Sequence, residues 1–199
     1  MSIDGDDRRP AQSPGTMVVV VGPSGAGKDT LMDYASVQLA GRPGFHFTRR
    51  VITRSCDAGG ENHDAVSMQE FNRLEDAGAF AVSWEAHGLK YGIPSTVHRH
   101  LEAGDVVIAN GSRSALPHFG TAFVRLKVLN IVARPDVLAM RLEQRGRESR
   151  DDILRRLERS SLTVAGDFDV TTVDNSGAIE EAGRAIMQVL EQSCTYRHA

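Results

Sequence analysis

Residues 16–30 read TMVVVVGPSGAGKDT, a run of β-branched residues that passes directly into a glycine-rich stretch. A short, continuous apolar run of this kind is typical of a strand buried in a parallel sheet. The segment Gly22–Lys28 fits the phosphate-binding pattern G-x-x-x-x-G-K, in which backbone N–H groups converge on phosphate oxygens. The stretch therefore predicts a strand, a nucleotide-binding loop and a helix. The alternative is a glycine-rich turn that only links strand to helix.

The rest of the chain continues this alternation, which favours an α/β fold with a doubly wound parallel sheet. The first helix is expected from Lys28 to about Leu39. Further strands are expected at 44–48, 105–110, 124–133 and 167–175, and further helices at 95–104, 135–146, 150–160 and 178–190.

Residues 49–94 depart from this alternation, and we interpret them as a small α+β insertion. A helix there is predicted to begin after Ser67, because Glu70 follows at the spacing of a capping box. We expect residues 1–15 to be a disordered tail and residues 16–199 to form one domain.

Composition restricts the class of protein. With 41% hydrophobic and 25% charged residues the chain is of ordinary globular type, and its net charge of −3 argues against a nucleic-acid-binding surface. Cys56 and Cys194 form no C-x-x-C pair, so neither a disulfide framework nor a zinc site is indicated. No signal peptide or membrane span is recognisable, and a cytoplasmic protein is expected. The oligomeric state stays open, with a homodimer among the alternatives.

Asp29 stands where the loop pattern usually has serine or threonine, and Thr30 follows one residue late. Its carboxylate could hold Mg²⁺ directly or through water, since Mg²⁺ prefers oxygen ligands. The alternative is an acid that only favours the first helical turn. A carboxylate beside phosphates is repulsive unless a cation lies between them, so we predict that Asp29 belongs to a metal site.

Polar side chains near the expected strand ends are candidates for holding a second, phosphorylated ligand. Forked guanidinium groups suit phosphate oxygens, and the carboxyl ends of parallel strands are where such folds bind ligands. The alternative for any one arginine is a solvated surface position. Two loop histidines, His63 and His87, could contact the sugar of a ligand, but a lone loop histidine is more often polar surface, and we interpret them so. The candidates are Arg49, Arg50, Arg54, Tyr91, Asn110 and Arg113.

The stretches VVGPSGAGKDTL, TRRVITR, FAVSWEAHGLKYGIP and RPDVLAMRLEQRGRES resemble the guanylate kinase family in order and spacing, over nearly all of residues 17–176. The resemblance implies a P-loop NTPase core, a substrate-binding insertion at 49–94 and an arginine-rich lid at 145–152. It implies that Lys28 binds the donor phosphates during catalysis. It also implies that the transferring phosphoryl group is held by Arg141, Arg145 and Arg156. It implies that the nucleotide is bound by Gly22, Pro23, Ser24, Gly25, Ala26, Gly27, Lys28, Asp29, Thr30 and Asn175, the last of these against adenine.

Four positions depart from that family pattern. Asp29 replaces a hydroxyl, Ser83 stands where a glutamate reads guanine, Asn110 replaces an acid, and residues 59–67 lack an expected Asp-Tyr pair. A base-reading site that loses its carboxylate loses the hydrogen bonds that select guanine. The acceptor pocket is therefore predicted to take a ligand that is not a guanine nucleotide.

Residues 22–29, 57–67, 84–94 and 110–113 together resemble the ribose 1,5-bisphosphate phosphokinases of bacterial phosphonate catabolism. That resemblance implies ATP and Mg²⁺ as cofactors, ribose 1,5-bisphosphate as the acceptor and 5-phosphoribosyl 1-diphosphate as the product. The alternatives are a guanylate kinase, a non-catalytic guanylate-kinase-like module that binds proteins, and a P-loop ATPase of another acceptor. Because the acceptor phosphate is already an anion, no general base is expected, and catalysis should consist of positioning and charge neutralisation.

Overall fold

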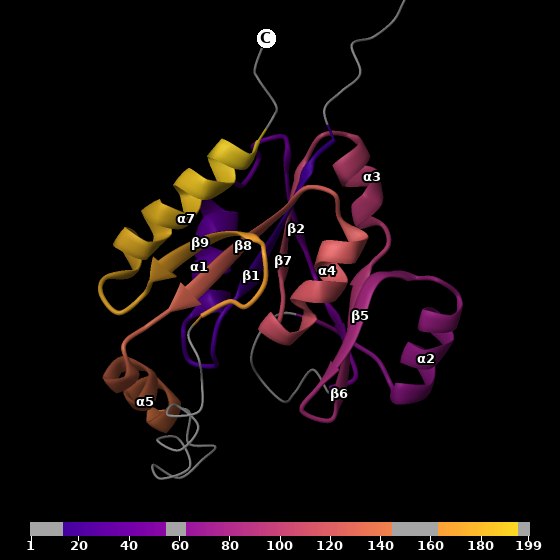
Figure 1. Cartoon of the computed structure of the whole chain (residues 1–199), viewed down its shortest axis with the longest axis horizontal. Coiled ribbons are helices and arrows are strands. Elements are labelled where there is room, and N and C mark those ends of the chain that lie inside the picture. The colour runs from indigo at the N-terminus through magenta and orange to yellow at the C-terminus, as the bar shows by residue number, and fades with distance from the viewer. Residues whose placement is uncertain (1–13, 55–62, 145–162, 195–199) are drawn as a thin grey trace, which may run out of the picture.

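Five parallel strands form the central sheet in the order β2-β7-β1-β8-β9 (Figure 1). The computed structural model describes residues 14–54, 63–144 and 163–194. The strands are β1 (Thr16–Val21), β2 (Phe45–Thr48), β7 (Val106–Asn110), β8 (Leu126–Val132) and β9 (Asp169–Asp174). The phosphate-loop strand β1 therefore lies in the middle of the sheet, and its carboxyl end is flanked by those of β7 and β8.

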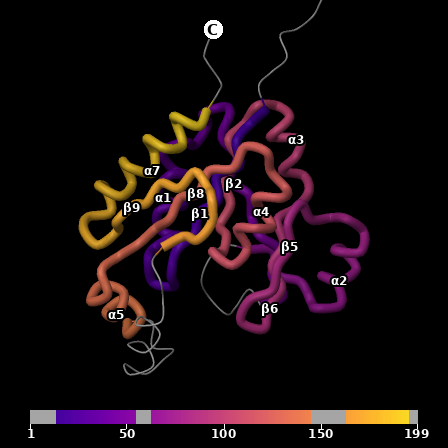
Figure 2. Tube along the Cα trace, viewed as in Figure 1, coloured from indigo at the N-terminus to yellow at the C-terminus, as the bar shows by residue number. Residues whose placement is uncertain are grey.

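Helices cover both faces of this sheet, and the alternation of side chains along β1 assigns each face its core (Figure 2). Val18 and Val20 pack on the face that carries α1 and α7, whereas Met17, Val19 and Val21 pack on the face that carries α3 and α4. The helices are α1 (Lys28–Gln38), α3 (Val97–Glu102), α4 (Leu116–Ala122), α5 (Pro135–Gln144) and α7 (Ile179–Ser193).

A second sheet, of order β4-β3-β6-β5, stands beside the central one and carries helix α2 (Figure 1). It comprises β3 (Val51–Ile52), β4 (Asp64–Ala65), β5 (Phe80–Ala86) and β6 (Leu89–Pro94), with α2 at Met68–Asp76. Ser67 caps α2 as predicted, because its Oγ accepts a hydrogen bond of 3.1 Å from the backbone N–H of Glu70. The Glu70 carboxylate bonds Arg73 one turn further on, so the reciprocal half of the capping box is replaced by an ion pair.

The α/β class and the parallel sheet predicted from the sequence are confirmed. Helix α4 was not predicted, and it follows a 3₁₀ turn at Arg113–Ala115. The predicted helix at 150–160, the lid at 145–152 and residues 1–13 of the predicted tail lie outside the described residues. Across the described part of the chain, no helix is long and apolar enough to cross a membrane.

Candidate functional site

The glycine-rich loop between β1 and α1 fits so closely against its surroundings that two of its glycines have no room for a side chain. A Cβ on Gly22 would lie 2.1 Å from the carbonyl oxygen of Ile131, and one on Gly27 would lie 2.3 Å from Asn175 Nδ2. Both glycines also have positive φ, 148° and 88°. Gly27 is the N-cap of α1, so no side chain shields the N–H groups of the first turn from an anion.

Lys28 is folded back over this loop. Its Nζ donates hydrogen bonds to the carbonyl oxygens of Gly22, at 3.0 Å, and Pro23, at 3.3 Å. The ammonium group is thereby held at the mouth of the loop, where phosphates would lie.

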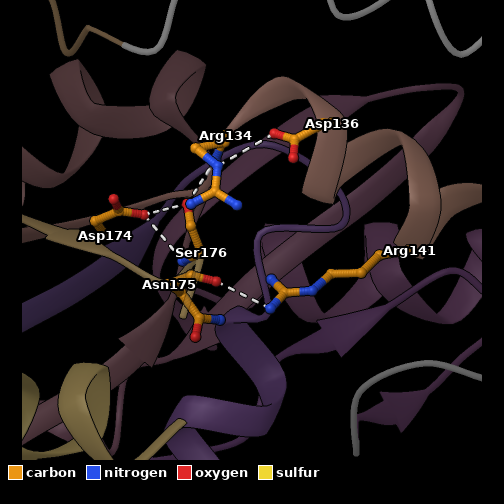
Figure 3. Close-up of polar contacts among 6 residues, drawn as sticks. All are labelled: Arg134, Asp136, Arg141, Asp174, Asn175 and Ser176. Atoms are coloured by element: carbon orange, nitrogen blue, oxygen red, sulfur yellow. Dashed lines mark hydrogen bonds and ion pairs between the residues drawn. The ribbon is translucent and has the colours of Figure 1, made fainter. Parts of the chain in front are cut away.

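The outer side of the loop is tied to the segment after β9 and to α5. Asn175 is 5% exposed and its Nδ2 donates to the carbonyl oxygen of Ala26 at 2.7 Å. Arg141 on α5 donates from Nη2 to the carbonyl oxygen of Asn175 at 2.9 Å, and its Nη1 lies 3.4 Å from the carbonyl oxygen of Gly25 (Figure 3). Asn175 thus secures the loop through its amide rather than projecting into open space.

The segment that carries Asn175 is itself fixed by a short polar chain (Figure 3). Ser176 Oγ accepts from the backbone N–H of Arg134 at 2.7 Å, and the Asp174 carboxylate accepts from the backbone N–H of Ser176 at 2.9 Å. A hollow of about 420 Å³ opens beside this segment. Its lining residues are Gly25, Gly27, Thr30, Arg141, Gln144, Asn175, Gly177 and Ile179.

A second hollow, of about 280 Å³, lies on the other side of the loop, between the central sheet and the insertion. We call it the acceptor cleft. Its lining residues are Gly22, Ser24, Gly25, Gly27, Lys28, Asp29, Arg50, Arg54, Trp84, Ala86, His87, Tyr91, Asn110, Gly111 and Ser112.

Asp29 and Asn110 meet in the acceptor cleft. Asn110 is the last residue of β7, is 5% exposed, and donates from Nδ2 to Asp29 Oδ1 at 2.8 Å. The parallel register, in which Asn110 pairs with Val20, brings the end of β7 beside the phosphate loop. Asp29 and Asn110, both of which depart from the family pattern, are therefore in direct contact.

The insertion contributes an aromatic wall with an arginine over it. Trp84 and Tyr91 form a cross-strand pair whose rings stack at 5.3 Å with an interplanar angle of 8°. The guanidinium carbon of Arg50 lies 5.8 Å from the Trp84 ring centroid and 5.2 Å from that of Tyr91. Cation–π contacts thus hold Arg50 at the cleft.

Ser83 faces the opposite way from Trp84. It pairs with Gly92, and its Oγ donates to Glu75 on α2 at 2.6 Å, where Lys90 Nζ also donates at 2.8 Å. The hydrogen bond from Lys90, and then that from Ser83, hold the pKa of the Glu75 carboxyl below its usual value. The position predicted to decide base recognition therefore belongs to a polar cluster outside the acceptor cleft.

The remaining arginines of the sequence analysis occupy different surroundings. Arg49 is not among the residues that line the cleft; it forms an ion pair with Asp64 at 2.8 Å and donates to the carbonyl oxygen of His63 at 3.1 Å, with 52% of its side chain exposed. Arg54 lines the cleft, and its Nε is buried without a hydrogen-bond partner among the described residues. Arg113 lies in the 3₁₀ turn after β7, where burial lowers the pKa of its guanidinium group. Arg145 and Arg156 lie outside the described residues.

The profile of the family described as Guanylate kinase matches residues 14–193. The chain belongs to the guanylate kinase family. It is 89% identical to a ribose 1,5-bisphosphate phosphokinase PhnN of Agrobacterium fabrum, over 89% of this chain and 97% of that protein. It is 60% identical to a protein of the same name from Rhizobium etli, over 89% of this chain and 90% of that one. A guanylate kinase structure from Anaplasma phagocytophilum shares the fold, with a TM-score of 0.62 and 18% identity over 93% of this chain and 89% of that one.

The structure thus brings together most of the nucleotide-binding candidates of this guanylate kinase family member around one loop, with Arg50, Arg54, Tyr91 and Asn110 across the acceptor cleft. Sequence reasoning missed Trp84 and Ala86 as cleft residues and interpreted His87 as surface, although it lines the cleft. Recognising His87-Gly88 as a tight turn, with φ of 53° and 73°, would have placed Trp84 opposite Tyr91. His63 is buried at 5% exposure, so the surface interpretation is wrong for it.

Proposed function

We propose that this chain transfers the γ-phosphoryl group of ATP to ribose 1,5-bisphosphate, with 5-phosphoribosyl 1-diphosphate and ADP as products. An oxygen of the sugar 1-phosphate forms a new bond to the γ-phosphorus of ATP. The bond between that phosphorus and the β–γ bridging oxygen breaks, and this oxygen leaves with ADP. The observation that carries the proposal is the 89% identity to a ribose 1,5-bisphosphate phosphokinase over 97% of that protein.

The composition of the acceptor cleft supports the same substrate. Asp29 is the one carboxylate among its described lining residues, and it is already bonded to Asn110 beside the phosphate loop. A guanine ring would need an acceptor for its N–H groups on the insertion side, where the wall instead presents Trp84 and Tyr91. The guanidinium groups of Arg50 and Arg54 suit a ligand that carries two phosphates.

On the donor side, we assign the ATP phosphates to the loop N–H groups and to Lys28, with Thr30 in the first turn of α1. The hollow bordered by Thr30, Arg141 and Asn175 would take the nucleoside. Asn175 would contribute there mainly by securing the loop, because its amide is bonded to Ala26. Arg141 lies on the loop backbone, within reach of the donor phosphates once they are bound.

The residues present fit a Mg²⁺ ion carried by ATP. Asp29 offers an oxygen ligand beside the phosphate loop, and Mg²⁺ is usually held by one or two carboxylates together with substrate phosphates and water. Among the described residues no group of three acidic, histidine or cysteine side chains forms a metal cage, which agrees with a metal that arrives with its nucleotide. When bound, the ion would neutralise charge on the transferring phosphates.

On the acceptor side, we assign one phosphate of the sugar to Arg50 and Tyr91 and the other to Arg54, without fixing which phosphate takes which residue. The attacking phosphate is already ionised, so these residues position it and absorb its charge, and no group need remove a proton. Arg145 and Arg156, outside the described residues, are proposed to complete the charge neutralisation. Arg49 and Arg113 are assigned weaker, longer-range contributions to the positive potential of the cleft.

The test is an assay of ADP release with ATP and Mg²⁺, in which ribose 1,5-bisphosphate and GMP are compared at equal concentrations. We expect turnover with the sugar bisphosphate and none above background with GMP, and loss of turnover in Lys28→Met. Turnover of GMP alone would return the chain to the guanylate kinases. ADP release that does not depend on either acceptor would favour a P-loop ATPase whose acceptor is neither of the two tested. Absence of nucleotide binding would favour the non-catalytic module.

A further inference from the structure

The contact between Asn110 and Asp29 links two elements that are remote in the sequence. Asn110 ends β7 and Asp29 lies in the first turn of α1, and the hydrogen bond from Nδ2 to Oδ1 measures 2.8 Å. A hydrogen bond to a charged acceptor is among the stronger kinds, about 1.5–3 kcal/mol, and this one is partly buried. The contact therefore fixes the Asp29 side chain more firmly than its position in an open loop would.

An amide is the side chain that suits this position. A carboxylate at 110 would place two acids at hydrogen-bond distance, where both cannot stay ionised. An apolar residue at 110 would leave Asp29 without this donor. Asn110 supplies an N–H group and adds no charge, and the Asp29 side chain whose Oδ1 accepts that N–H also lines the cleft.

We propose that Asn110 is a positioning residue for the metal site: it holds the Asp29 carboxylate in the orientation that receives the Mg²⁺ of the bound nucleotide. The function of Asn110 is then on the donor side, in place of the contact with the acceptor that the sequence suggested. This inference rests on the donor half of the proposed function and does not depend on which acceptor is used.

The experiment measures ADP binding by calorimetry with and without Mg²⁺, for wild type, Asp29→Asn, Asn110→Leu and the double variant. The measured quantity is the dissociation constant without Mg²⁺ divided by the dissociation constant with Mg²⁺. This ratio expresses how much the ion strengthens ADP binding. Loss of a residue that orients a metal ligand typically weakens metal affinity by roughly 10-fold to 100-fold. We expect that ratio to fall by about tenfold in Asn110→Leu, with ADP binding in the absence of Mg²⁺ little changed.

The double variant tests whether Asn110 acts through Asp29. If it does, Asp29→Asn combined with Asn110→Leu loses no more of the Mg²⁺ effect than Asp29→Asn alone, because the two changes remove one interaction. Additive losses would overturn the inference, as would an unchanged ratio in Asn110→Leu. Equal weakening with and without Mg²⁺ would show that Asn110 only maintains the fold of the loop.

A matched control is available on β8, which lies on the other side of β1 from β7. Asn130 of β8 is also a buried asparagine, at 2% exposure, and its Nδ2 lies 3.5 Å from Thr172 Oγ1, outside both hollows. Asn130→Leu should leave the Mg²⁺ ratio unchanged even where it lowers thermal stability. Asn110→Ala serves as a second variant if Asn110→Leu folds poorly, with the same expected ratio. No sugar enters these measurements, so a failure of the proposed acceptor would leave their result standing.

Discussion

At the level of single residues, the phosphate loop depends on contacts that leave no space for side chains. The position of Gly27 is limited by Asn175, whose amide in turn holds the carbonyl of Ala26. Three groups are thus packed against one another: Gly27, the carbonyl of Ala26 and the side-chain amide of Asn175. A change at any of them should alter the spacing of the N–H groups that would bind phosphate.

Gly27→Ala is expected to weaken nucleotide binding and to lower stability. A Cβ there would lie 2.3 Å from Asn175 Nδ2, and φ is 88°, a conformation that costs a residue other than glycine about 1–3 kcal/mol. Gly41→Ala is the control, because Gly41 has φ of 77° but a Cβ there would meet nothing within 4 Å. Thermal melts should show a loss in both variants, whereas calorimetry with ADP should show weaker binding only for Gly27→Ala. Equal ADP affinity in the two variants would contradict this account of the loop.

At the level of elements, the sequence predicts β1, the loop and α1 because their signals are local: a β-branched run, glycines at fixed spacing and a lysine. Helix α4 escapes prediction because LPHFGTA contains proline and glycine, and its burial of Leu116 and Phe119 is decided by the sheet beneath. The Asp29–Asn110 contact also could not be predicted, since it depends on the register between β1 and β7.

The sequence also could not predict which side chains of strand β5 lie on the cleft side of the sheet. A change of one residue in hairpin register moves every side chain to the opposite face of the sheet. Trp84 pairs with Tyr91, and both rings line the cleft. Ser83 lies on the opposite face and hydrogen-bonds Glu75, which also accepts from Lys90. We therefore expect any contact of β5 with the acceptor to come from the face that carries Trp84.

Ser83→Glu is accordingly expected not to create GMP turnover. The new carboxylate would lie beside that of Glu75, where Ser83 Oγ now donates at 2.6 Å, and like charges would compete for Lys90. A loss of about 1–3 kcal/mol in stability is expected, since a partly buried hydrogen bond is replaced by repulsion. Urea unfolding measures the loss, and the ADP-release assay with GMP measures the activity. Appearance of GMP turnover in this variant would show that Ser83 reaches the acceptor after all.

At the level of the whole molecule, the acceptor cleft lies between two separate sheets, the central sheet and that of the insertion. The central sheet supplies the phosphate loop and Asn110, and the insertion supplies the aromatic wall. Arg50 lies where the chain passes from β2 of the central sheet to β3 of the insertion, so its guanidinium group stands at the junction of the two. Donor and acceptor binding should therefore respond to different substitutions.

Arg49 and Arg50 are neighbours in sequence, and they give this separation a matched test. Arg50 lies over Trp84 and Tyr91 in the cleft, whereas Arg49 is paired with Asp64 outside it. Arg50→Met should raise the KM for ribose 1,5-bisphosphate by roughly 10-fold or more, because a charge-assisted phosphate contact contributes about 1.5–3 kcal/mol, and should leave the KM for ATP nearly unchanged. Arg49→Met should change either constant by less than about threefold, because Arg49 does not line the cleft and its ion pair with Asp64 is exposed. Equal effects of the two variants would mean that the positive charge of the whole segment, rather than the arginine held by the aromatic wall, binds the acceptor.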